Sequence, residues 1–285
     1  MNISSDTKVY VVIGDPIEHS LSPLMHNLAF QRLNLNSVYL AFKVKAQNLR
    51  EAIAGLRSLN VLGFNVTVPH KVSIMKYLDE VDMQAIEIGA VNTVVNQDEM
   101  LIGYNTDGIG ALAALKEEGV ALKGLKVMLL GAGGAAKAIA FSILPLINHL
   151  VILNRTEQKA KDLALSLKER LGSEVEWRKM EEATLHEEFV DTDLLINATS
   201  IGMYPKIDET PVNKIYLHQE MMVFDVVYNP LMTRLLKEAK ESGANIVGGV
   251  KMLVYQGASA FKLWTGKKPP IYEMCAAVEN YLRGN

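Results

Sequence analysis

The stretch Lys126-Val127-Met128-Leu129-Leu130-Gly131-Ala132-Gly133-Gly134-Ala135-Ala136 decides the fold of this chain. An apolar run of strand length enters a glycine cluster with the spacing G-x-G-x-x-A, and an alanine-rich segment of helical length follows. Glycine lets the backbone approach a pyrophosphate closely, and the helix that begins there points its amide dipoles at the anion. The pattern predicts a dinucleotide-binding turn, although alone it also fits an ordinary glycine-rich turn of a parallel α/β protein.

The residues after this turn strengthen the nucleotide-binding interpretation. Pro145 is expected to stop the helix, and His149-Leu150-Val151-Ile152-Leu153 predicts a second buried strand. Together these segments complete a strand–helix–strand unit of the length expected around a nucleotide-binding turn.

The composition describes a soluble globular chain with a large core. Its 285 residues suffice for about two domains, and 49% of them are hydrophobic against 21% charged. The 29 basic and 32 acidic side chains leave a formal charge of −3, which offers no footprint for nucleic acid or an anionic membrane. Cys275 is the single cysteine, and the polar start from Met1 to Thr7 lacks the apolar core of a signal peptide. These features predict a cytoplasmic protein.

Strand-like and helix-like segments alternate along the chain, which favours parallel or mostly parallel sheets and predicts the α/β class. Apolar runs predict strands at 8–13, 38–42, 61–68, 93–95, 101–104, 126–130, 149–153, 194–196, 222–227 and 245–247. Helical spacing predicts helices at 24–33, 46–58, 73–78, 83–88, 157–171, 231–242, 250–264 and 271–282, and a further one that starts at Asp107.

Polar residues cluster at the end of the strand predicted at 61–68. Asn65 and Thr67 point to the same face of an extended chain, so both could address one ligand at the edge of the sheet. Lys71 stands near the next predicted helix start, where the partial positive dipole disfavours its charged form. That placement suits a lysine that exchanges protons, and a solvated lysine is the alternative.

Several other polar residues are candidate ligands, each with a structural alternative. Ser20 and Ser22 share a face if the stretch is extended, and paired hydroxyls suit a carboxylate or a polyol. Ser22 is equally well placed to be a helix N-cap, with Pro23 at the first helical position. Asp107 could likewise be only an N-cap, and Gln256 could serve only a structural hydrogen bond in its apolar stretch.

Two further residues, Asn92 and Tyr228, stand at or near predicted strand ends, where the ligand loops of α/β proteins lie. The six histidines show no metal-ligand spacing with the acidic residues or with Cys275. We therefore predict no metal site.

The cofactor is expected to be NADP because of the residues after the strand predicted at 149–153. An NAD-specific site places an acidic side chain at the end of this strand, whereas this chain has Asn154 and no carboxylate until Glu157. Arg155 can donate paired hydrogen bonds to a 2′-phosphate, Thr156 can add a hydroxyl, and Lys159 can add charge one turn later. The alternative is that Arg155 is solvated and Thr156 only caps the helix.

Nine short motifs together resemble the shikimate dehydrogenase family, and they follow one another in the family's order over nearly the whole chain. They are HSLSP (19–23), NVTVPHK (65–71), GAVNT (89–93), YNTDG (104–108), GAGGAAKA (131–138), NRT (154–156), NATSIGMYP (197–205), DVVYNP (225–230) and MLVYQGA (252–258). Lys137 stands where the family commonly has arginine, and Lys251 stands where it usually has glycine.

This resemblance implies two α/β domains with the active site in the cleft between them. A mostly parallel-sheet substrate domain would comprise residues 1–106 and 249–285, and a Rossmann-type NADP domain would comprise 107–248. The implied reaction is the NADPH-dependent, reversible reduction of 3-dehydroshikimate to shikimate in aromatic amino-acid biosynthesis, by a monomer or a homodimer.

The resemblance also implies a role for each matching residue. Lys71 and Asp107 resemble the family's catalytic pair. The implied substrate ligands are Ser20, Ser22, Asn65, Thr67, Asn92, Tyr228 and Gln256. The implied cofactor contacts are Gly131, Ala132, Gly133, Gly134, Ala135, Asn154, Arg155, Thr156, Lys159, Met203, Val226 and Gly249.

Three alternative functions stay open at this point. The chain could act on quinate, possibly with NAD; it could be another Rossmann reductase; or it could be a non-catalytic sensor of shikimate-like ligands. The Ser20–Ser22 pair favours shikimate over the bulkier quinate. The motifs of the first domain argue against another reductase, and the presence of both Lys71 and Asp107 argues against a sensor.

Overall fold

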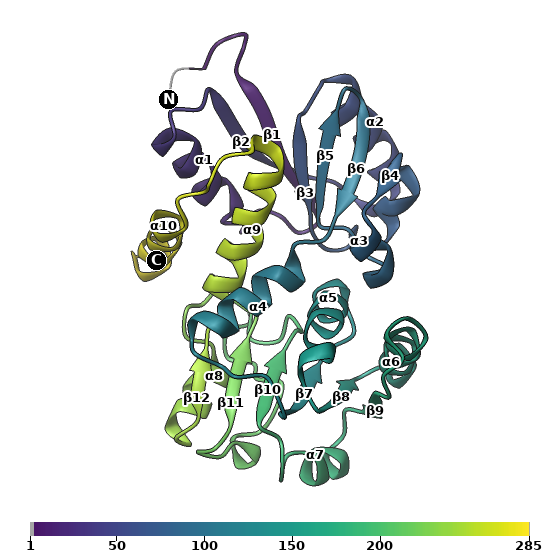
Figure 1. The fold of residues 1–285 in the computed structure, drawn as a ribbon. Coiled ribbons are helices and arrows are strands. Elements are labelled where there is room, and N and C mark those ends of the chain that lie inside the picture. The colour runs from purple at the N-terminus through teal and green to yellow at the C-terminus, as the bar shows by residue number, and fades with distance from the viewer. Residues whose placement is uncertain (1–2, 285) are drawn as a thin grey trace. The chain divides into compact units, whose positions relative to one another are not determined.

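The computed structural model describes residues 3–284 and divides into two compact units, drawn as ribbons in Figure 1. One unit comprises the chain through Gly110 together with Val254–Gly284, and the other comprises Ala111–Leu253. Both divisions fall inside helices, α4 (Asp107–Glu117) and α9 (Gly249–Thr265). Met1, Asn2 and Asn285, at the outer limits of the predicted substrate domain, lie outside the described residues.

The first unit is built on a six-stranded sheet with the order β2-β1-β3-β5-β6-β4. Its strands are β1 (Lys8–Gly14), β2 (Ser37–Lys43), β3 (Gly63–Val66), β4 (Glu80–Val81), β5 (Thr93–Gln97) and β6 (Met100–Tyr104). Its helical segments, besides parts of α4 and α9, are α1 (Ser22–Arg32), η1 (Ala46–Asn48), α2 (Leu49–Ser58), η2 (Ser73–Tyr77), α3 (Met83–Ile88) and α10 (Ile271–Gly284). β1 pairs in parallel with β2 and β3, and β5 is antiparallel to β3 and β6.

Side chains alternate along β1 and so build a core on each face of this sheet. Val11 belongs to the cluster that includes Ile53 of α2. Tyr10 points the other way and packs against Phe30 of α1 and Trp264 of α9, with ring centroids 5.2 and 5.3 Å away. α9, from the C-terminal part of the chain, therefore completes a core that the N-terminal strands begin.

The second unit is built on a six-stranded, fully parallel sheet with the order β12-β11-β10-β7-β8-β9. Its strands are β7 (Lys126–Leu130), β8 (His149–Asn154), β9 (Glu176–Lys179), β10 (Leu194–Asn197), β11 (Met222–Asp225) and β12 (Asn245–Val247). Its helical segments are α5 (Gly134–Ile143), η3 (Leu144–Leu146), α6 (Glu157–Leu171), α7 (Glu182–Glu188), η4 (Lys214–Tyr216) and α8 (Arg234–Glu241).

The strand order of the second unit reverses between β7 and β10, which is the topology of a doubly wound nucleotide-binding fold. β7 and β8 consist almost entirely of buried apolar residues because helices cover both faces of a parallel sheet. The strand–helix–strand unit predicted around Gly131 is β7–α5–β8, and Pro145 follows directly after α5 in η3, as expected.

Other predictions about secondary structure are wrong in detail. β4, β9 and α7 are not predicted: β4 has two residues, β9 is a polar edge strand and α7 is short and mostly polar, so none offers an apolar pattern. The helix predicted at 73–78 is the 3-10 segment η2, and the one at 46–58 is divided into η1 and α2. The strand predicted at 61–68 is limited to Gly63–Val66. The helix predicted at 231–242 begins only at Arg234, because the Thr233 hydroxyl accepts the Leu236 amide and caps it.

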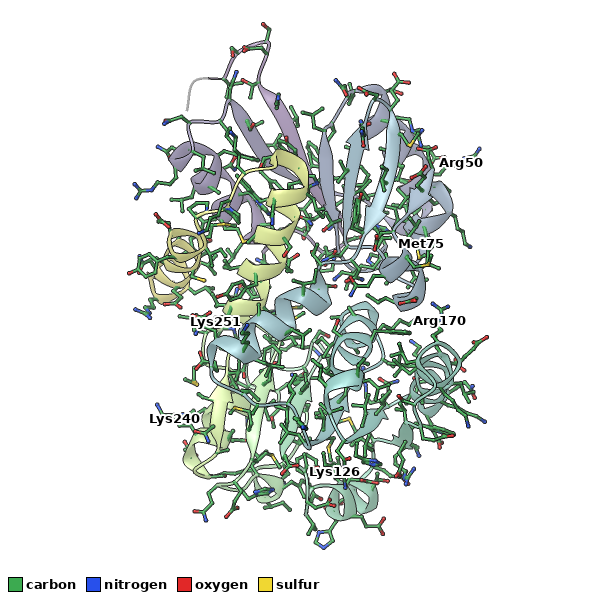
Figure 2. The ribbon with its side chains drawn as sticks, viewed as in Figure 1. Arg50, Met75, Lys126, Arg170, Lys240 and Lys251 are labelled. Carbon is green, nitrogen blue, oxygen red and sulfur yellow. The ribbon has the colours of Figure 1, made fainter. Side chains whose placement is uncertain are left out.

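Lys251, labelled in Figure 2, lies inside α9 and joins it to the end of α4. Its Nζ atom is 2.5 Å from a Glu118 carboxylate oxygen and 3.1 Å from a Glu117 carboxylate oxygen. Burial lowers the pKa of this ammonium, but the hydrogen bonds that it donates to both carboxylates outweigh burial and leave the pKa raised. The lysine that departs from the family pattern is therefore accommodated as an ion pair on a regular helix. No helix among residues 3–284 is long and apolar enough to cross a membrane.

We expect Gly63→Ala to destabilise the first unit, because an added Cβ would lie 2.3 Å from the Trp264 ring. Trp264 cannot move freely, since its Nε1 donates to the Val94 carbonyl at 2.9 Å. Overpacking of this kind costs about 1–3 kcal/mol of unfolding free energy, measured by urea denaturation. Gly55→Ala in α2 is the matched control: its Cβ meets open space, so a small gain in stability is expected. Equal effects of the two substitutions would contradict this packing argument.

Candidate active site

A buried ion pair forms the centre of the candidate site in the first unit. The Lys71 Nζ atom donates to Asp107 Oδ2 at 2.5 Å, and the two side chains are only 15% and 6% exposed. Lys71 follows β3, and Asp107 is the first residue of α4. The backbone of Lys71 is also fixed, because the Val91 amide donates a hydrogen bond to the Lys71 carbonyl at 2.8 Å.

The helix-dipole argument for Lys71 is wrong. The element that follows is η2, a 3-10 segment of five residues rather than an α-helix. The group that acts on the Lys71 ammonium is instead the Asp107 carboxylate.

Asn92 holds the other carboxylate oxygen of this pair. Its Nδ2 donates to Asp107 Oδ1 at 2.7 Å and lies 3.3 Å from Gln256 Oε1 of α9. Its Oδ1 accepts the Thr106 amide at 2.8 Å. Both Asp107 oxygens are therefore used by Lys71 and Asn92, and the alternative that Asp107 serves only as an N-cap is not supported.

Asn65 is bound inside the protein rather than facing open space. Its Oδ1 accepts the Tyr39 hydroxyl at 2.6 Å, and its Nδ2 donates to Thr93 Oγ1 at 3.0 Å and to the Asn92 carbonyl at 3.1 Å. These bonds use both amide hydrogens, so the structure gives Asn65 a supporting role. Thr67 lies just beyond β3 and is partly exposed.

The two serines do not lie in an extended stretch. Leu21 has φ −90° and ψ 1° and occupies the N-cap position of α1, so Ser22 is the first residue of the helix. The prediction that Ser22 caps the helix is therefore wrong. The amide of Ser22 instead donates to Ser20 Oγ at 3.4 Å. Ser22 is buried and Ser20 is partly exposed.

In the second unit, the glycine-rich turn has the geometry of a cradle for an anion. Gly131 has φ +107°, and an added Cβ would lie 3.1 Å from the Ala198 carbonyl, so glycine is required there. Gly133 occupies the N-cap of α5 and is exposed, and an added Cβ there would meet open space. Ala132, Gly134 and Ala135 are partly exposed. The α5 amides are thus open to a phosphate.

The residues after β8 are also placed for a ligand. Asn154 Nδ2 donates to the Thr156 carbonyl at 2.8 Å and so shapes the turn. Arg155, Thr156 and Lys159 are exposed. Thr156 occupies the N-cap position of α6, but within the described chain its hydroxyl makes no capping hydrogen bond, so capping does not occupy it.

The remaining candidate residues also belong to the second unit. Gly249 has a packing reason to be glycine, because an added Cβ would lie 2.4 Å from the Val226 carbonyl. Val226 donates its amide to the Asn197 carbonyl at 3.0 Å. Met203 is 40% exposed, and Tyr228 is partly buried.

Asp225 is a buried carboxylate that is not among the residues predicted from the sequence. Its Oδ1 accepts the Asn197 Nδ2 at 2.9 Å and the Val227 amide at 3.0 Å, and its Oδ2 accepts the Thr233 hydroxyl at 2.7 Å. These bonds join the ends of β10 and β11 to the cap of α8. The signal for it in the sequence is an acid at the last position of an apolar strand, Met222–Asp225. Burial raises the pKa of this carboxyl to about 6, because the three hydrogen bonds, which lower the pKa, offset burial only in part.

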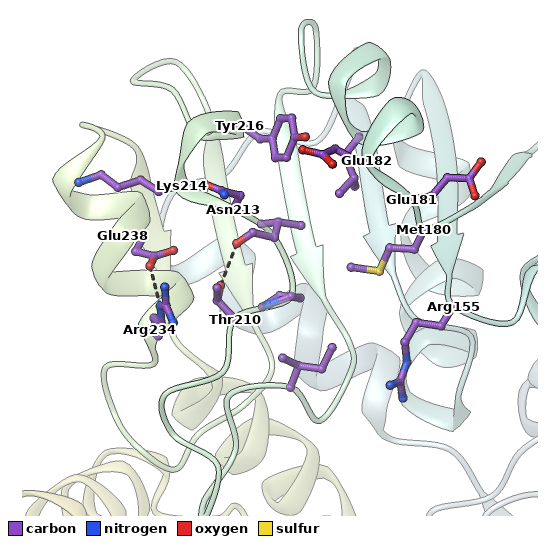
Figure 3. Close-up of a pocket in the computed structure, with 14 residues that line it drawn as sticks. Arg155, Met180, Glu181, Glu182, Thr210, Asn213, Lys214, Tyr216, Arg234 and Glu238 are labelled. Atoms are coloured by element: carbon purple, nitrogen blue, oxygen red, sulfur yellow. Dashed lines mark hydrogen bonds and ion pairs between the residues drawn. The ribbon is translucent and has the colours of Figure 1, made fainter.

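A cavity of about 610 Å³ opens in the second unit, close to Arg155 (Figure 3). In the view of Figure 3, Arg155 lies at one end and the Arg234–Glu238 ion pair at the other. The cavity is lined only by residues of this unit, so it is separate from the Lys71–Asp107 pair.

Comparisons with known proteins identify the family to which the chain belongs. Family models match the shikimate dehydrogenase substrate binding domain over residues 12–94, shikimate / quinate 5-dehydrogenase over 112–230, and the shikimate 5'-dehydrogenase C-terminal domain over 249–279. The chain is 50% identical over 281 residues to the shikimate dehydrogenase (NADP(+)) of Methanocaldococcus jannaschii, which covers 97% of this chain and 98% of that protein.

Solved structures match as closely. A shikimate dehydrogenase in complex with NADP+ has a TM-score of 0.93 at 48% identity and covers 99% of this chain and 98% of that one. The shikimate 5-dehydrogenase of Thermus thermophilus, in complex with NADP(H) and shikimate, has a TM-score of 0.86 at 36% identity, covering 96% and 99%.

The fold and these matches define the class as two-domain α/β oxidoreductases that use NADP. The chain belongs to the shikimate dehydrogenase family, as its motifs predict. The predicted α/β class and NADP cofactor are confirmed, whereas the role of each residue stays a prediction.

The raised pKa of Asp225 predicts how stability depends on pH. The folded-state pKa, about 6, lies above the usual value of 3.8, so this carboxyl favours folding below pH 4 and loses that contribution as the pH rises through 6. The loss is about 3 kcal/mol at most, because one pKa unit corresponds to about 1.4 kcal/mol. Asp225→Asn cannot ionise, so its unfolding free energy relative to the parent should rise between pH 4 and 7 in urea denaturation.

Asp191→Asn is the control for this experiment. A hydrogen bond from Lys126 lowers the pKa of Asp191 below its usual value of 3.8, so Asp191 is ionised in both states above that pH and the relative stability of this variant should change little between pH 4 and 7. If the parent and Asp225→Asn show the same pH dependence, Asp225 does not titrate as described.

Proposed function

We propose that Lys71 and Asp107 are the acid–base pair with which this member of the family reduces 3-dehydroshikimate to shikimate, reversibly and with NADPH. This reaction is a step of aromatic amino-acid biosynthesis. The observation that supports the proposal is the buried Lys71–Asp107 contact, with Asn92 fixing the second carboxylate oxygen.

Carbonyl reduction requires a hydride at carbon and a proton at oxygen. The bound nicotinamide supplies the hydride. Lys71 carries hydrogens that it can donate to the developing alkoxide, and in the reverse direction it can accept the hydroxyl proton. Asp107 orients the ammonium, and the fixed position of Asp107 keeps the donor directed without reorganisation during the reaction.

The substrate ligands follow from the groups around this pair. Asn92 and Gln256 place side-chain amides beside Asp107. Thr67, which lies just beyond the end of β3 and is partly exposed, is a further proposed ligand. We assign the hydroxyls of Ser20 and Ser22 to the substrate carboxylate, since hydroxyl donors suit an anion. Tyr228 stays a proposed ligand, and Asn65 is better assigned to support these groups than to touch the substrate.

The cofactor is assigned to the second unit. Residues 131–135 would hold the pyrophosphate, because the turn is open and leads into the N-terminus of α5. Arg155, Thr156 and Lys159 would bind the 2′-phosphate, and the strand end carries the neutral Asn154 instead of an acid. Met203, Val226 and Gly249 are proposed as further contacts. A cytoplasmic location is part of the proposal, supported by the single cysteine.

Quinate is the second candidate substrate, because one matching family model describes shikimate and quinate enzymes together. An absorbance assay of the purified protein with shikimate and with quinate, each with NADP and with NAD, separates the candidates. Turnover mainly with quinate or with NAD would overturn the present assignment, and no turnover with any pair would favour a sensor.

Lys71→Met should lower kcat by about 10²–10⁴-fold and change KM for shikimate only a few-fold, because the proton is needed in the transition state. Steady-state kinetics measure both constants. Because the substitution leaves Asp107 without its cation, circular dichroism is used to check that the variant folds. Lys45→Met, at an exposed lysine, is the control and should be fully active. A Lys71→Met enzyme with near-normal kcat would refute the role of Lys71.

Arg155→Ala should strongly reduce kcat/KM for NADP and leave that for NAD almost unchanged, because only NADP carries the 2′-phosphate. Arg170→Ala, at the other end of α6, is the matched control and should alter neither value. Equal losses with both cofactors would show that Arg155 does not discriminate between them.

A further inference from the structure

A continuous series of buried hydrogen bonds connects Tyr39 with Asp107. The Tyr39 hydroxyl donates to Asn65 Oδ1 at 2.6 Å, and Asn65 Nδ2 donates to Thr93 Oγ1 at 3.0 Å. Thr93 Oγ1 donates to Asn92 Oδ1 at 3.0 Å, and Asn92 Nδ2 donates to Asp107 at 2.7 Å. All these residues lie in the first unit.

The direction of donation along this series is determined by its partners. Asn65 must present its oxygen to Tyr39, because its nitrogen faces two acceptors, the Asn92 carbonyl and Thr93 Oγ1. Tyr39 must then donate its single hydrogen to Asn65, so its oxygen can only accept. Burial raises the pKa of the Tyr39 phenol well above its usual value, so the phenol keeps the hydrogen that it donates.

The Tyr39 ring is held in place by aromatic packing. It is fully buried and stacks on His26, with ring centroids 4.4 Å apart and planes at 15°. Trp264 packs at 5.9 Å. Burial lowers the pKa of His26 to about 3, so the neighbouring ring is neutral at physiological pH. The phenol therefore has one position, and removing its oxygen leaves the packing of the ring intact.

We propose that Tyr39 is a positioning residue for catalysis: it fixes Asn65, which through Thr93 and Asn92 sets the position of Asp107. The inference rests on the proposed role of Asp107.

Tyr39→Phe is therefore expected to separate the two kinetic constants. The kcat should fall by roughly 10- to 100-fold, because a small displacement of a catalytic group is costly. The KM for shikimate should change only a few-fold, because the position of Asp107 matters chiefly in the transition state. A merely structural defect would not lower kcat while preserving KM.

Tyr10→Phe is the matched control, since Tyr10 lies opposite Tyr39 in the β1–β2 register and packs against the same Trp264. This control should keep kcat and KM. A double-mutant cycle with Asn65→Ala tests the route: if Tyr39 acts through Asn65, the double variant should lose no more kcat than Asn65→Ala alone. If Tyr39→Phe does not fold, Thr93→Val should show the same loss confined to kcat.

The inference is overturned if Tyr39→Phe behaves like Tyr10→Phe, if KM rises while kcat is kept, or if the losses in the cycle are additive. Lys71→Met distinguishes this failure from failure of the proposed function. An inactive Lys71→Met enzyme beside a normal Tyr39→Phe enzyme removes only the role of Tyr39, whereas an active Lys71→Met enzyme removes the proposed catalytic pair itself.

Discussion

The negative charge of Asp107 is the constraint on which the polar interior of the first unit depends. A carboxylate that is 6% exposed is costly unless a cation and hydrogen-bond donors compensate it, and Lys71 and Asn92 supply both. Asn92 must itself be satisfied, which brings in Thr106 and Thr93, and Thr93 brings in Asn65. One buried charge thus organises a network that extends across β3 and β5.

The second unit solves a similar problem without a cation. Asp225 is fully buried, and its partners are a backbone amide and the side chains of Asn197 and Thr233. Neutral donors compensate a buried charge less well, so the pKa of Asp225 is raised, to about 6. The arrangement nevertheless ties together the ends of two strands at the edge of the sheet where ligand loops of a doubly wound fold lie.

The elements that were predicted and those that were missed differ in one physical respect. β7, α5 and β8 were predicted because their signals are local: an apolar run, glycines in fixed spacing and a proline. β9 was missed because an edge strand can be polar when only one side of it pairs. The cap of α1 was misassigned because Leu21 occupies the position for which a serine is usually preferred.

By itself the sequence determined the α/β class, the nucleotide turn and the identity of Lys71 and Asp107 as candidates, because these depend on residue type and short spacing. Only the tertiary structure decided that Asn65 faces inward, that Tyr39 belongs to the network and that Asp225 is buried. Those facts depend on contacts between residues far apart in the chain, such as Tyr39 on β2 and Asn65 on β3. The strands β2 and β3 do not pair with each other, because β1 lies between them and pairs with both. A buried hydrogen bond has no local signature, since its partner is chosen by the packing of the whole sheet.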